Sequence, residues 1–129
     1  MADVRPLLRS ALLPPKPPAR RHMISIADLE REDVERLLAL ARTFARSLER
    51  DVKKLPTLRG RTIVNLFFEA STRTSSSFEL AAKRLSADVM SIKSSGSAVE
   101  KGESLKDTLL TIGAYDPDVI VIRHAHIGA

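Results

Sequence analysis

The residues best suited to chemistry form the run Ser71-Thr72-Arg73-Thr74, which follows an apolar segment of the chain. The apolar segment predicts a strand and the residues after the run predict an amphipathic helix, so the run lies at a helix N-terminus. The first N–H groups of a helix have no intrahelical partner and stabilise an anion. The hydroxyls add donors, and the planar guanidinium of Arg73 matches a phosphate with two parallel hydrogen bonds. The run therefore predicts a site for a phosphate-bearing ligand.

A second cation, Arg123, follows the short apolar run Val119–Ile122. Because ligands of open α/β sheets bind at the carboxyl ends of strands, we expect Arg123 and residues 71–74 to converge on one anion. The structural alternative is a Ser/Thr helix cap with ordinary surface arginines. His124 and His126 have an i, i+2 spacing, but two histidines without a third ligand do not predict a metal site. We expect neither a metal nor a cofactor.

The elements that must position these residues alternate between strand and helix. Strands are predicted over 62–68, 88–92 and 119–122, and helices over about 73–85 and 104–114. Such short crossovers imply a parallel α/β sheet flanked by helices, with right-handed connections. The expected buried side of the helix over 73–85 consists of Phe78, Leu80, Ala81, Ala82 and Leu85.

A further helix is predicted from Leu29 to about Arg50, because apolar residues there recur at helical spacing. Ser25 and Asp28 are its candidate N-caps. Residues 1–22 contain the proline run 14–18 and predict an irregular basic arm, whereas residues 23–129 form the folded domain.

Length and composition limit the function classes. With 129 residues the chain forms one domain at most, and without cysteine it has no disulfide framework. No apolar run approaches the roughly 18 residues that indicate a membrane span. The absence of cysteine suits a cytoplasmic protein, which is what we expect. The net charge is +5, of which residues 1–22 carry +4. A basic arm on a nearly neutral domain does not predict a nucleic-acid partner.

Three stretches carry a family resemblance. Residues 71–74 with Ser77-Phe78-Glu79 resemble the carbamoyl-phosphate motif of the transcarbamoylases, and the likeness continues through 101–108 and 119–124. Together they are similar to the catalytic chain of aspartate carbamoyltransferases, from about residue 24 to the last residue. The resemblance covers only the N-terminal part of such a chain. It implies a carbamoyl-phosphate-binding domain that is incomplete at its C-terminus, with the aspartate-binding domain absent.

The resemblance also implies an enzyme activity, the transfer of a carbamoyl group from carbamoyl phosphate to L-aspartate in de novo pyrimidine synthesis. Arg73, Thr74 and Arg123 are the implied catalytic residues. The implied substrate-binding residues are Ser71, Thr72, Arg73, Thr74, Ser97, Lys101, Arg123 and His124.

The assembly implied by the resemblance is a homotrimer, because the matching serine and lysine of the family, here Ser97 and Lys101, reach into the site of a neighbouring subunit. A regulatory chain or a dihydroorotase are the further partners that it allows. Glu69 is expected to pair with Arg123 while the site is empty. One departure concerns Ser75, which stands where the family often has a second arginine.

Several alternatives stay open. Ornithine carbamoyltransferase shares the Ser-Thr-Arg-Thr run, although Lys101 before Gly-Glu and His124 after Arg123 favour the aspartate enzyme. A non-catalytic fragment, or a phosphate-binding module that assembles with a complete chain, is the alternative from another class. A nucleotide-phosphate binder is the weakest, because the chain lacks the glycine-rich phosphate loops.

Overall fold

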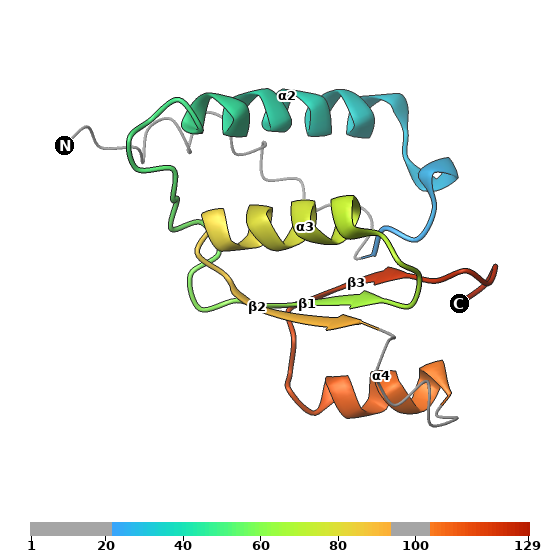
Figure 1. Cartoon of the computed structure of the whole chain (residues 1–129). Helices are drawn as coiled ribbons and strands as arrows, with labels where there is room; N and C mark the ends of the chain where they lie inside the picture. The colour runs from blue at the N-terminus through green and yellow to red at the C-terminus, as the bar shows by residue number, and fades with distance from the viewer. Residues whose placement is uncertain (1–21, 94–103) are drawn as a thin grey trace. The chain divides into compact units, whose positions relative to one another are not determined.

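The computed structural model describes residues 22–93 and 104–129 (Figure 1). The chain divides into two compact units, Met1–Lys53 and Lys54–Ala129. The first unit contains the short helix η1 (Ile26–Asp28) and helix α2 (Arg31–Ser47). The second contains, in chain order, β1 (Thr62–Phe67), α3 (Thr72–Arg84), β2 (Asp88–Lys93), α4 (Leu105–Gly113) and β3 (Val119–Arg123). The predicted order of strands and helices is confirmed.

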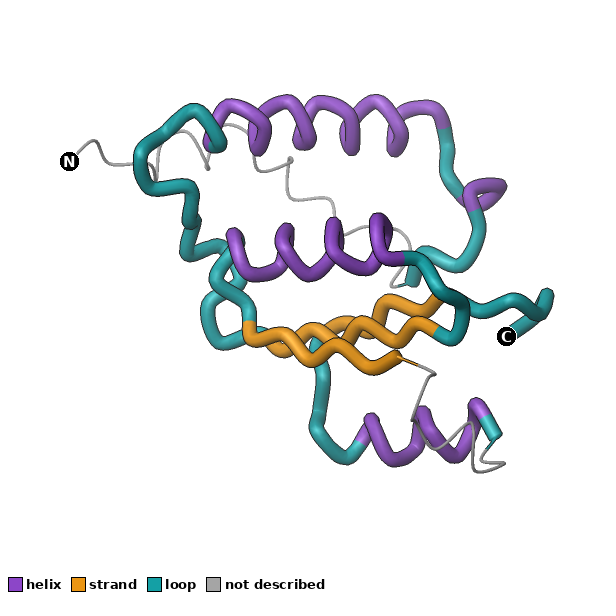
Figure 2. The backbone as a smooth tube through the Cα atoms, in the orientation of Figure 1, coloured by secondary structure: helices purple, strands orange, loops and turns teal. Residues whose placement is uncertain are grey.

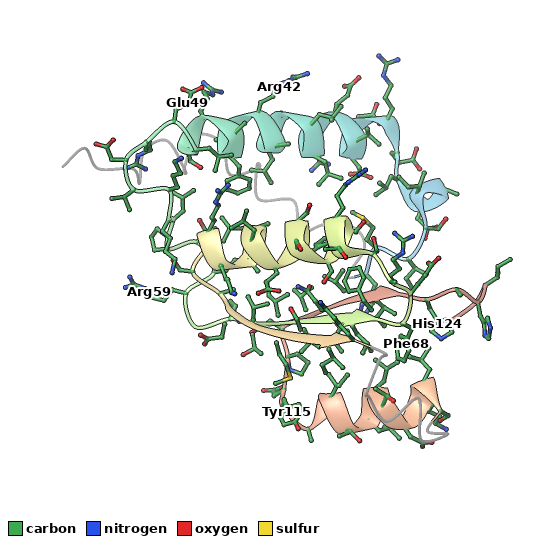
Figure 3. The ribbon with its side chains drawn as sticks, in the orientation of Figure 1. Arg42, Glu49, Arg59, Phe68, Tyr115 and His124 are labelled. Atoms are coloured by element: carbon green, nitrogen blue, oxygen red, sulfur yellow. The ribbon has the colours of Figure 1, made fainter. Side chains whose placement is uncertain are left out.

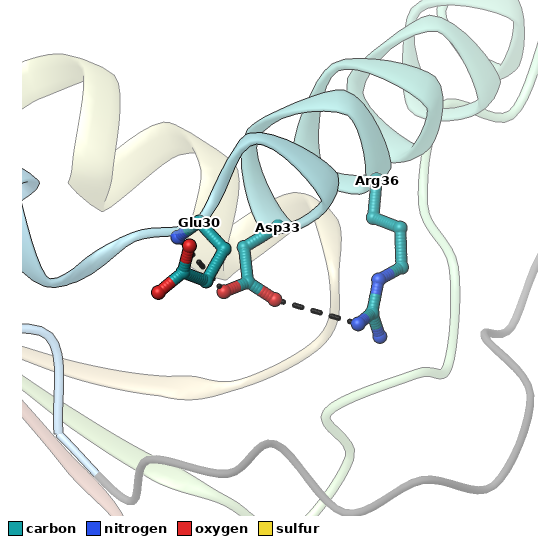
Figure 4. Close-up of polar contacts among 3 residues, drawn as sticks. All are labelled: Glu30, Asp33 and Arg36. Carbon is teal, nitrogen blue, oxygen red and sulfur yellow. Dashed lines mark hydrogen bonds and ion pairs between the residues drawn. The ribbon is translucent and has the colours of Figure 1, made fainter.

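Helix α2 begins later than predicted. Ser25 caps η1 instead, because its Oγ accepts a hydrogen bond from the N–H of Ala27 at 3.2 Å. The N-cap of α2 is Glu30, so the expectation of Ser25 or Asp28 as its cap is wrong. The N–H of Glu30 donates to the Asp33 carboxylate at 3.2 Å (Figure 4). The 3-10 turn ends at Asp28, and Leu29 and Glu30 have extended backbone, so α2 starts at Arg31.

The sheet of the second unit has three parallel strands in the order β2-β1-β3 (Figure 2). Strand β1 is central, and its residues 63–67 are all buried because they have a strand on each side and a helix on each face. The α/β class predicted from the sequence is therefore confirmed. Among the described residues no helix is long and apolar enough to cross a membrane.

One face of the sheet forms the hydrophobic core with α4. Val64, Leu66 and Ile112 are at most 2% exposed and form its centre. Six partly buried residues surround this centre: Phe68, Met90, Ile92, Leu105, Leu109 and Ile120. Because side chains alternate along a strand, the even-numbered residues of β1 and β3 face α4, and the odd-numbered ones face the other side.

Helix α3 lies on the opposite face of the sheet from α4 (Figure 1). It meets the sheet through small residues, since Ser75 and Ala82 are its buried positions. Phe78 and Leu80 are 46% and 48% exposed, so their predicted burial is wrong. The apolar periodicity predicts the helix correctly, but close approach to the sheet selects small side chains rather than large ones.

A polar cross-link ties α3 to β2. The Glu79 carboxylate accepts hydrogen bonds from Lys83 Nζ at 2.6 Å and from Ser91 Oγ at 3.1 Å. These two bonds, the one from Lys83 first, hold the pKa of Glu79 below its ordinary value. The cross-link restrains the helix that carries the predicted anion site.

A second polar cluster joins the amino ends of β1 and β3. The Asp118 carboxylate accepts the N–H of Thr62 at 2.8 Å and pairs with Arg61 Nη1 at 2.7 Å. The backbone N–H of Asp118 in turn donates to the carbonyl oxygen of Thr62 at 2.9 Å. The bond from Thr62, followed by that from Arg61, lowers the pKa of Asp118. This cluster sets the start of the β1–β3 register.

We expect Asp118→Asn to make stability less dependent on pH in acid. A carboxyl group whose pKa is lowered by folding stabilises the native state above its unfolded pKa, about 3.9, and loses that effect as pH falls through the folded value. The variant should therefore be less stable than the parent at pH 7, with the gap closing below about pH 4. Urea unfolding of the parent and the variant at pH 7 and pH 3 measures this difference in the free energy of unfolding.

The matched control for that experiment is Asp116→Asn, which removes a carboxylate from the same turn and leaves the Arg61–Asp118 pair intact. Asparagine tolerates the positive φ of 50° at this position. A gap between Asp118→Asn and the parent that is equal at both pH values would show that the charge of Asp118 does not contribute.

Candidate functional site

The carboxyl ends of β1 and β3 lie side by side. Phe67 is the register partner of Arg123, and the N–H of Phe68 donates to the carbonyl oxygen of Arg123 at 2.8 Å. The loop from β1 into α3 therefore starts next to the end of β3. This is the edge at which the sequence predicted a ligand site, and the structure brings both predicted segments to it.

The N-terminus of α3 is left without a side-chain cap. Ser71 is the N-cap residue, yet its hydroxyl makes no capping hydrogen bond. The first intrahelical bond runs from the N–H of Ser75 to the carbonyl oxygen of Ser71 at 2.9 Å. The preceding amides, those of residues 72–74, are the ones that a helix leaves without an intrahelical partner. Their partial positive charge and the helix dipole favour an anion at this point.

Helix α4, in contrast, has a side-chain cap at its N-terminus. Its N-cap, Ser104, accepts the N–H of Asp107 at 3.1 Å. Ser71 has the same side chain at the equivalent position of α3 and does not use it. The hydroxyl of Ser71 is therefore available to a ligand, together with those of Thr72 and Thr74. Ser71 and Thr74 are half-buried, whereas Thr72 and Arg73 are exposed.

Arg123 is held by Glu69 across the edge of the sheet. Its Nε lies 3.1 Å from Glu69 Oε2. The two side chains are 42% and 47% exposed, so water reaches the pair. The predicted pairing of Glu69 with Arg123 is present in the structure. Since Glu69 lies between β1 and α3, the ion pair joins the end of β3 to the loop that leads into residues 71–74.

His124 is the first residue after β3, and its side chain projects to the opposite face of the sheet from that of Arg123. Its ring centroid is 4.9 Å from that of Phe68, with the planes tilted by 55° (Figure 3). Its Nδ1 accepts the backbone N–H of His126 at 3.0 Å. The ring of His126 lies 5.1 Å from that of His124. Among residues 22–93 and 104–129 no group of three or more His, Cys, Asp or Glu side chains could hold a metal ion.

Ser75, where the resemblance led us to expect a second arginine, is a buried position of α3 that faces the sheet. It is only 6% exposed, and its N–H is already used within the helix. A side chain at this position is directed away from the open amides of residues 72–74.

Two predicted site residues, Ser97 and Lys101, lie outside the described residues. Sequence reasoning missed Phe68 as part of the site, although its ring contacts His124. A signal was available, because Phe68 and His124 each come directly after a strand, at positions that alternation assigns to the same face. The two residues can be paired from the sequence only if the register between β1 and β3 is known.

Comparisons with known proteins identify the family. Residues 21–129 match the family described as "Aspartate/ornithine carbamoyltransferase, carbamoyl-P binding domain". The chain belongs to this carbamoyltransferase family. It is 61% identical over 110 residues to the aspartate carbamoyltransferase catalytic subunit of Streptomyces griseus, with 85% of this chain and 34% of that relative covered. The corresponding subunit of Geotalea uraniireducens is 57% identical over 109 residues, covering 84% of this chain and 35% of its own length.

Solved structures of carbamoyltransferases have the same fold. The catalytic subunit of M. jannaschii aspartate transcarbamoylase superposes with a TM-score of 0.75 at 40% identity, over 85% of this chain and 36% of that one. The Trypanosoma cruzi aspartate transcarbamoylase in complex with carbamoyl phosphate gives a TM-score of 0.68 at 40% identity, over 76% and 30% of the two chains. The chain thus spans about a third of the length of the relatives that it matches.

Proposed function

We propose that this chain provides the carbamoyl-phosphate half of an aspartate carbamoyltransferase. The overall reaction converts carbamoyl phosphate and L-aspartate into N-carbamoyl-L-aspartate and phosphate, a step of de novo pyrimidine synthesis. The observation that carries the proposal is the uncapped N-terminus of α3, which lies at the same sheet edge as Arg123. The Trypanosoma cruzi relative has been solved with carbamoyl phosphate and aspartate, which supports the choice of substrates.

The phosphate group takes the place of the missing cap. The amides of residues 72–74 donate to its oxygens, with further donors from the hydroxyls of Ser71, Thr72 and Thr74. Arg73 contributes a charged, bidentate pair of hydrogen bonds. These donors are fixed by the helix, so little reorganisation accompanies binding. Arg123 also contributes to binding of the phosphate from the end of β3.

Catalysis requires polarisation of the carbamoyl carbonyl. Thr74 and Arg123 donate to the carbonyl oxygen, which makes the carbon more electrophilic. The aspartate amine attacks this carbon, and the bond between carbon and the bridging oxygen breaks, so that phosphate leaves with the electron pair. The amine loses one proton as the new C–N bond forms, and the departing phosphate accepts it. Positioning and electrostatic stabilisation account for the chemistry without a covalent intermediate on the protein.

The complete site extends beyond a single subunit in this proposal. Ser97 and Lys101 belong to a neighbouring copy's site, which makes the working unit a homotrimer in the cytoplasm. A regulatory chain or a dihydroorotase remains a further partner of that assembly.

The test is titration of the full 129-residue chain with inorganic phosphate and with N-(phosphonacetyl)-L-aspartate, followed by an assay of aspartate-dependent phosphate release from carbamoyl phosphate. Phosphate binding together with release supports the enzyme. Phosphate binding without release supports the alternative of a phosphate-binding module. Failure to bind either ligand contradicts an anion site in this chain.

We expect Glu69→Gln to strengthen phosphate binding. The change removes a carboxylate that competes for Arg123 and repels the anion. Because exposed ion pairs are worth about 0.2–1 kcal/mol, the gain should be roughly 1.5- to 5-fold at low salt and smaller at high salt. Isothermal titration with phosphate at two ionic strengths measures it.

The matched control is Glu69→Asp, which keeps the charge on a side chain one methylene shorter. It should not share the gain in affinity. Weaker binding by Glu69→Gln would mean that Glu69 holds Arg123 in the direction that the anion needs.

A further inference from the structure

Three contacts join the end of β1 to the end of β3. They are the backbone bond from Phe68 to Arg123, the ion pair of Glu69 with Arg123, and the ring contact of Phe68 with His124. The residues that make these contacts lie next to the proposed anion site, and only Arg123 has a direct role there.

The hydrogen bond at His124 determines where its ring carries a proton. Nδ1 accepts the backbone N–H of His126 at 3.0 Å, so Nδ1 must offer a lone pair. A neutral imidazole with an accepting Nδ1 carries its hydrogen on Nε2. The bond closes the turn after β3 over residues 124–126. A proton on Nδ1 would oppose the N–H of His126 and open this turn.

The ring of His124 is also tied to the core. Phe68, on which it rests, packs against the cluster of Val64, Leu66 and Ile112. His124 is therefore fixed on one side by a backbone hydrogen bond and on the other by a ring that is itself anchored. Arg123, one residue earlier, projects to the opposite face and reaches Glu69. Fixing His124 thus fixes the backbone from which Arg123 projects.

We propose that His124 is a positioning residue for Arg123, and that it acts through the hydrogen bond accepted by Nδ1 of its neutral, Nε2-protonated ring. The proposal rests on the anion site assigned above. It replaces direct substrate contact, the role that resemblance implied for His124, with an indirect one. A closed turn directs Arg123 toward the anion, and an open turn lets it rotate away.

Two substitutions separate the hydrogen bond from the ring contact. His124→Asn retains an acceptor that can bond the N–H two residues ahead, as in an Asx turn, but has no ring. His124→Phe retains a ring on Phe68 but has no acceptor. We expect His124→Phe to weaken phosphate binding by about fivefold, the usual effect of one lost hydrogen bond, and His124→Asn to stay within about twofold of the parent.

A double-mutant cycle excludes a merely structural effect. In an Arg123→Ala background, His124→Phe should cause no further loss of phosphate affinity, because a positioning residue has nothing left to position. An undiminished fivefold loss in that background would overturn the proposal. So would phosphate binding by His124→Phe as tight as that of the parent. Urea unfolding of each variant checks that all are folded.

Two measurements need no ligand. Long-range proton–nitrogen NMR on the full chain reports which nitrogen of His124 is protonated, and a protonated Nδ1 in the neutral ring would overturn the proposal. The Nε–H signal of Arg123 reports its pairing with Glu69, which His124→Phe should weaken and His124→Asn should preserve. If the parent binds no phosphate, the anion site fails, whereas these two signals still decide whether His124 orients Arg123.

Discussion

Arg73→Ala should remove measurable phosphate binding, with a loss of affinity of about 100-fold or more. Two charge-assisted hydrogen bonds of about 1.5–3 kcal/mol each are lost together. The open amides of α3 remain, but partial charges at a helix terminus contribute only about 0.3–1 kcal/mol at an exposed site. Arg73→Lys keeps the charge without the planar fork, so we expect an intermediate loss of roughly tenfold.

The matched control for Arg73 is Arg59→Ala. Arg59 is exposed and lies toward the amino end of β1, away from Phe68 and His124 (Figure 3). Its removal lowers the net charge by the same amount, so it corrects for any general attraction of phosphate to a basic protein. Titration at moderate salt suppresses that attraction further. If Arg73→Ala and Arg59→Ala bind phosphate equally well, the assignment of the anion to α3 is wrong.

Ile112→Ala should destabilise the second unit by about 2–5 kcal/mol. Ile112 is 2% exposed and contacts the centre of the core on the α4 face. Truncation loses the transfer free energy of its methyl groups and leaves a cavity beside β1, which has no spare side chain to fill it. A loss of this size is a large fraction of the 5–15 kcal/mol that stabilises a typical domain. Urea unfolding monitored by circular dichroism measures it.

Leu110→Ala is the control on the same helix. Leu110 is 65% exposed, so its truncation should change the free energy of unfolding by no more than about 0.5 kcal/mol. Similar effects of the two substitutions would mean that α4 does not pack on the sheet through Ile112. Phosphate added to Ile112→Ala should recover part of the lost stability, because a ligand that binds only the native state stabilises it by mass action.

The order of elements was predictable because each signal was local. The apolar runs at residues 62–68 and 119–122 predicted strands that end within about a residue of those observed. The face of α3 that meets the sheet was not predictable in the same way. Phe78 and Leu80 fit a helical apolar stripe, yet the distance between helix and sheet is set by Ser75 and Ala82. Hydrophobic periodicity indicates a helix without saying which side chains allow close approach.

The site was predictable in its composition but not in its contacts. Residue types and topology alone place Arg73 and Arg123 at one sheet edge. The contact between Phe68 and His124 depends on the pairing of Phe67 with Arg123. At the other end of the two strands, the Asp118 carboxylate accepts the N–H of Thr62 and so helps to set this register. Asp118 has no obvious link to the site. Sequence patterns do not specify such a distant constraint.

The unused hydroxyl of Ser71 has a thermodynamic consequence. A missing N-cap commonly leaves a helix less stable by about 1 kcal/mol. If an anion supplies the missing acceptor, then part of its binding free energy is also folding free energy of α3. The ligand-free helix should fray first at residues 72–74, and the bound anion should slow amide exchange there more than anywhere else in α3. Local order at this helix end thus becomes a direct readout of occupancy.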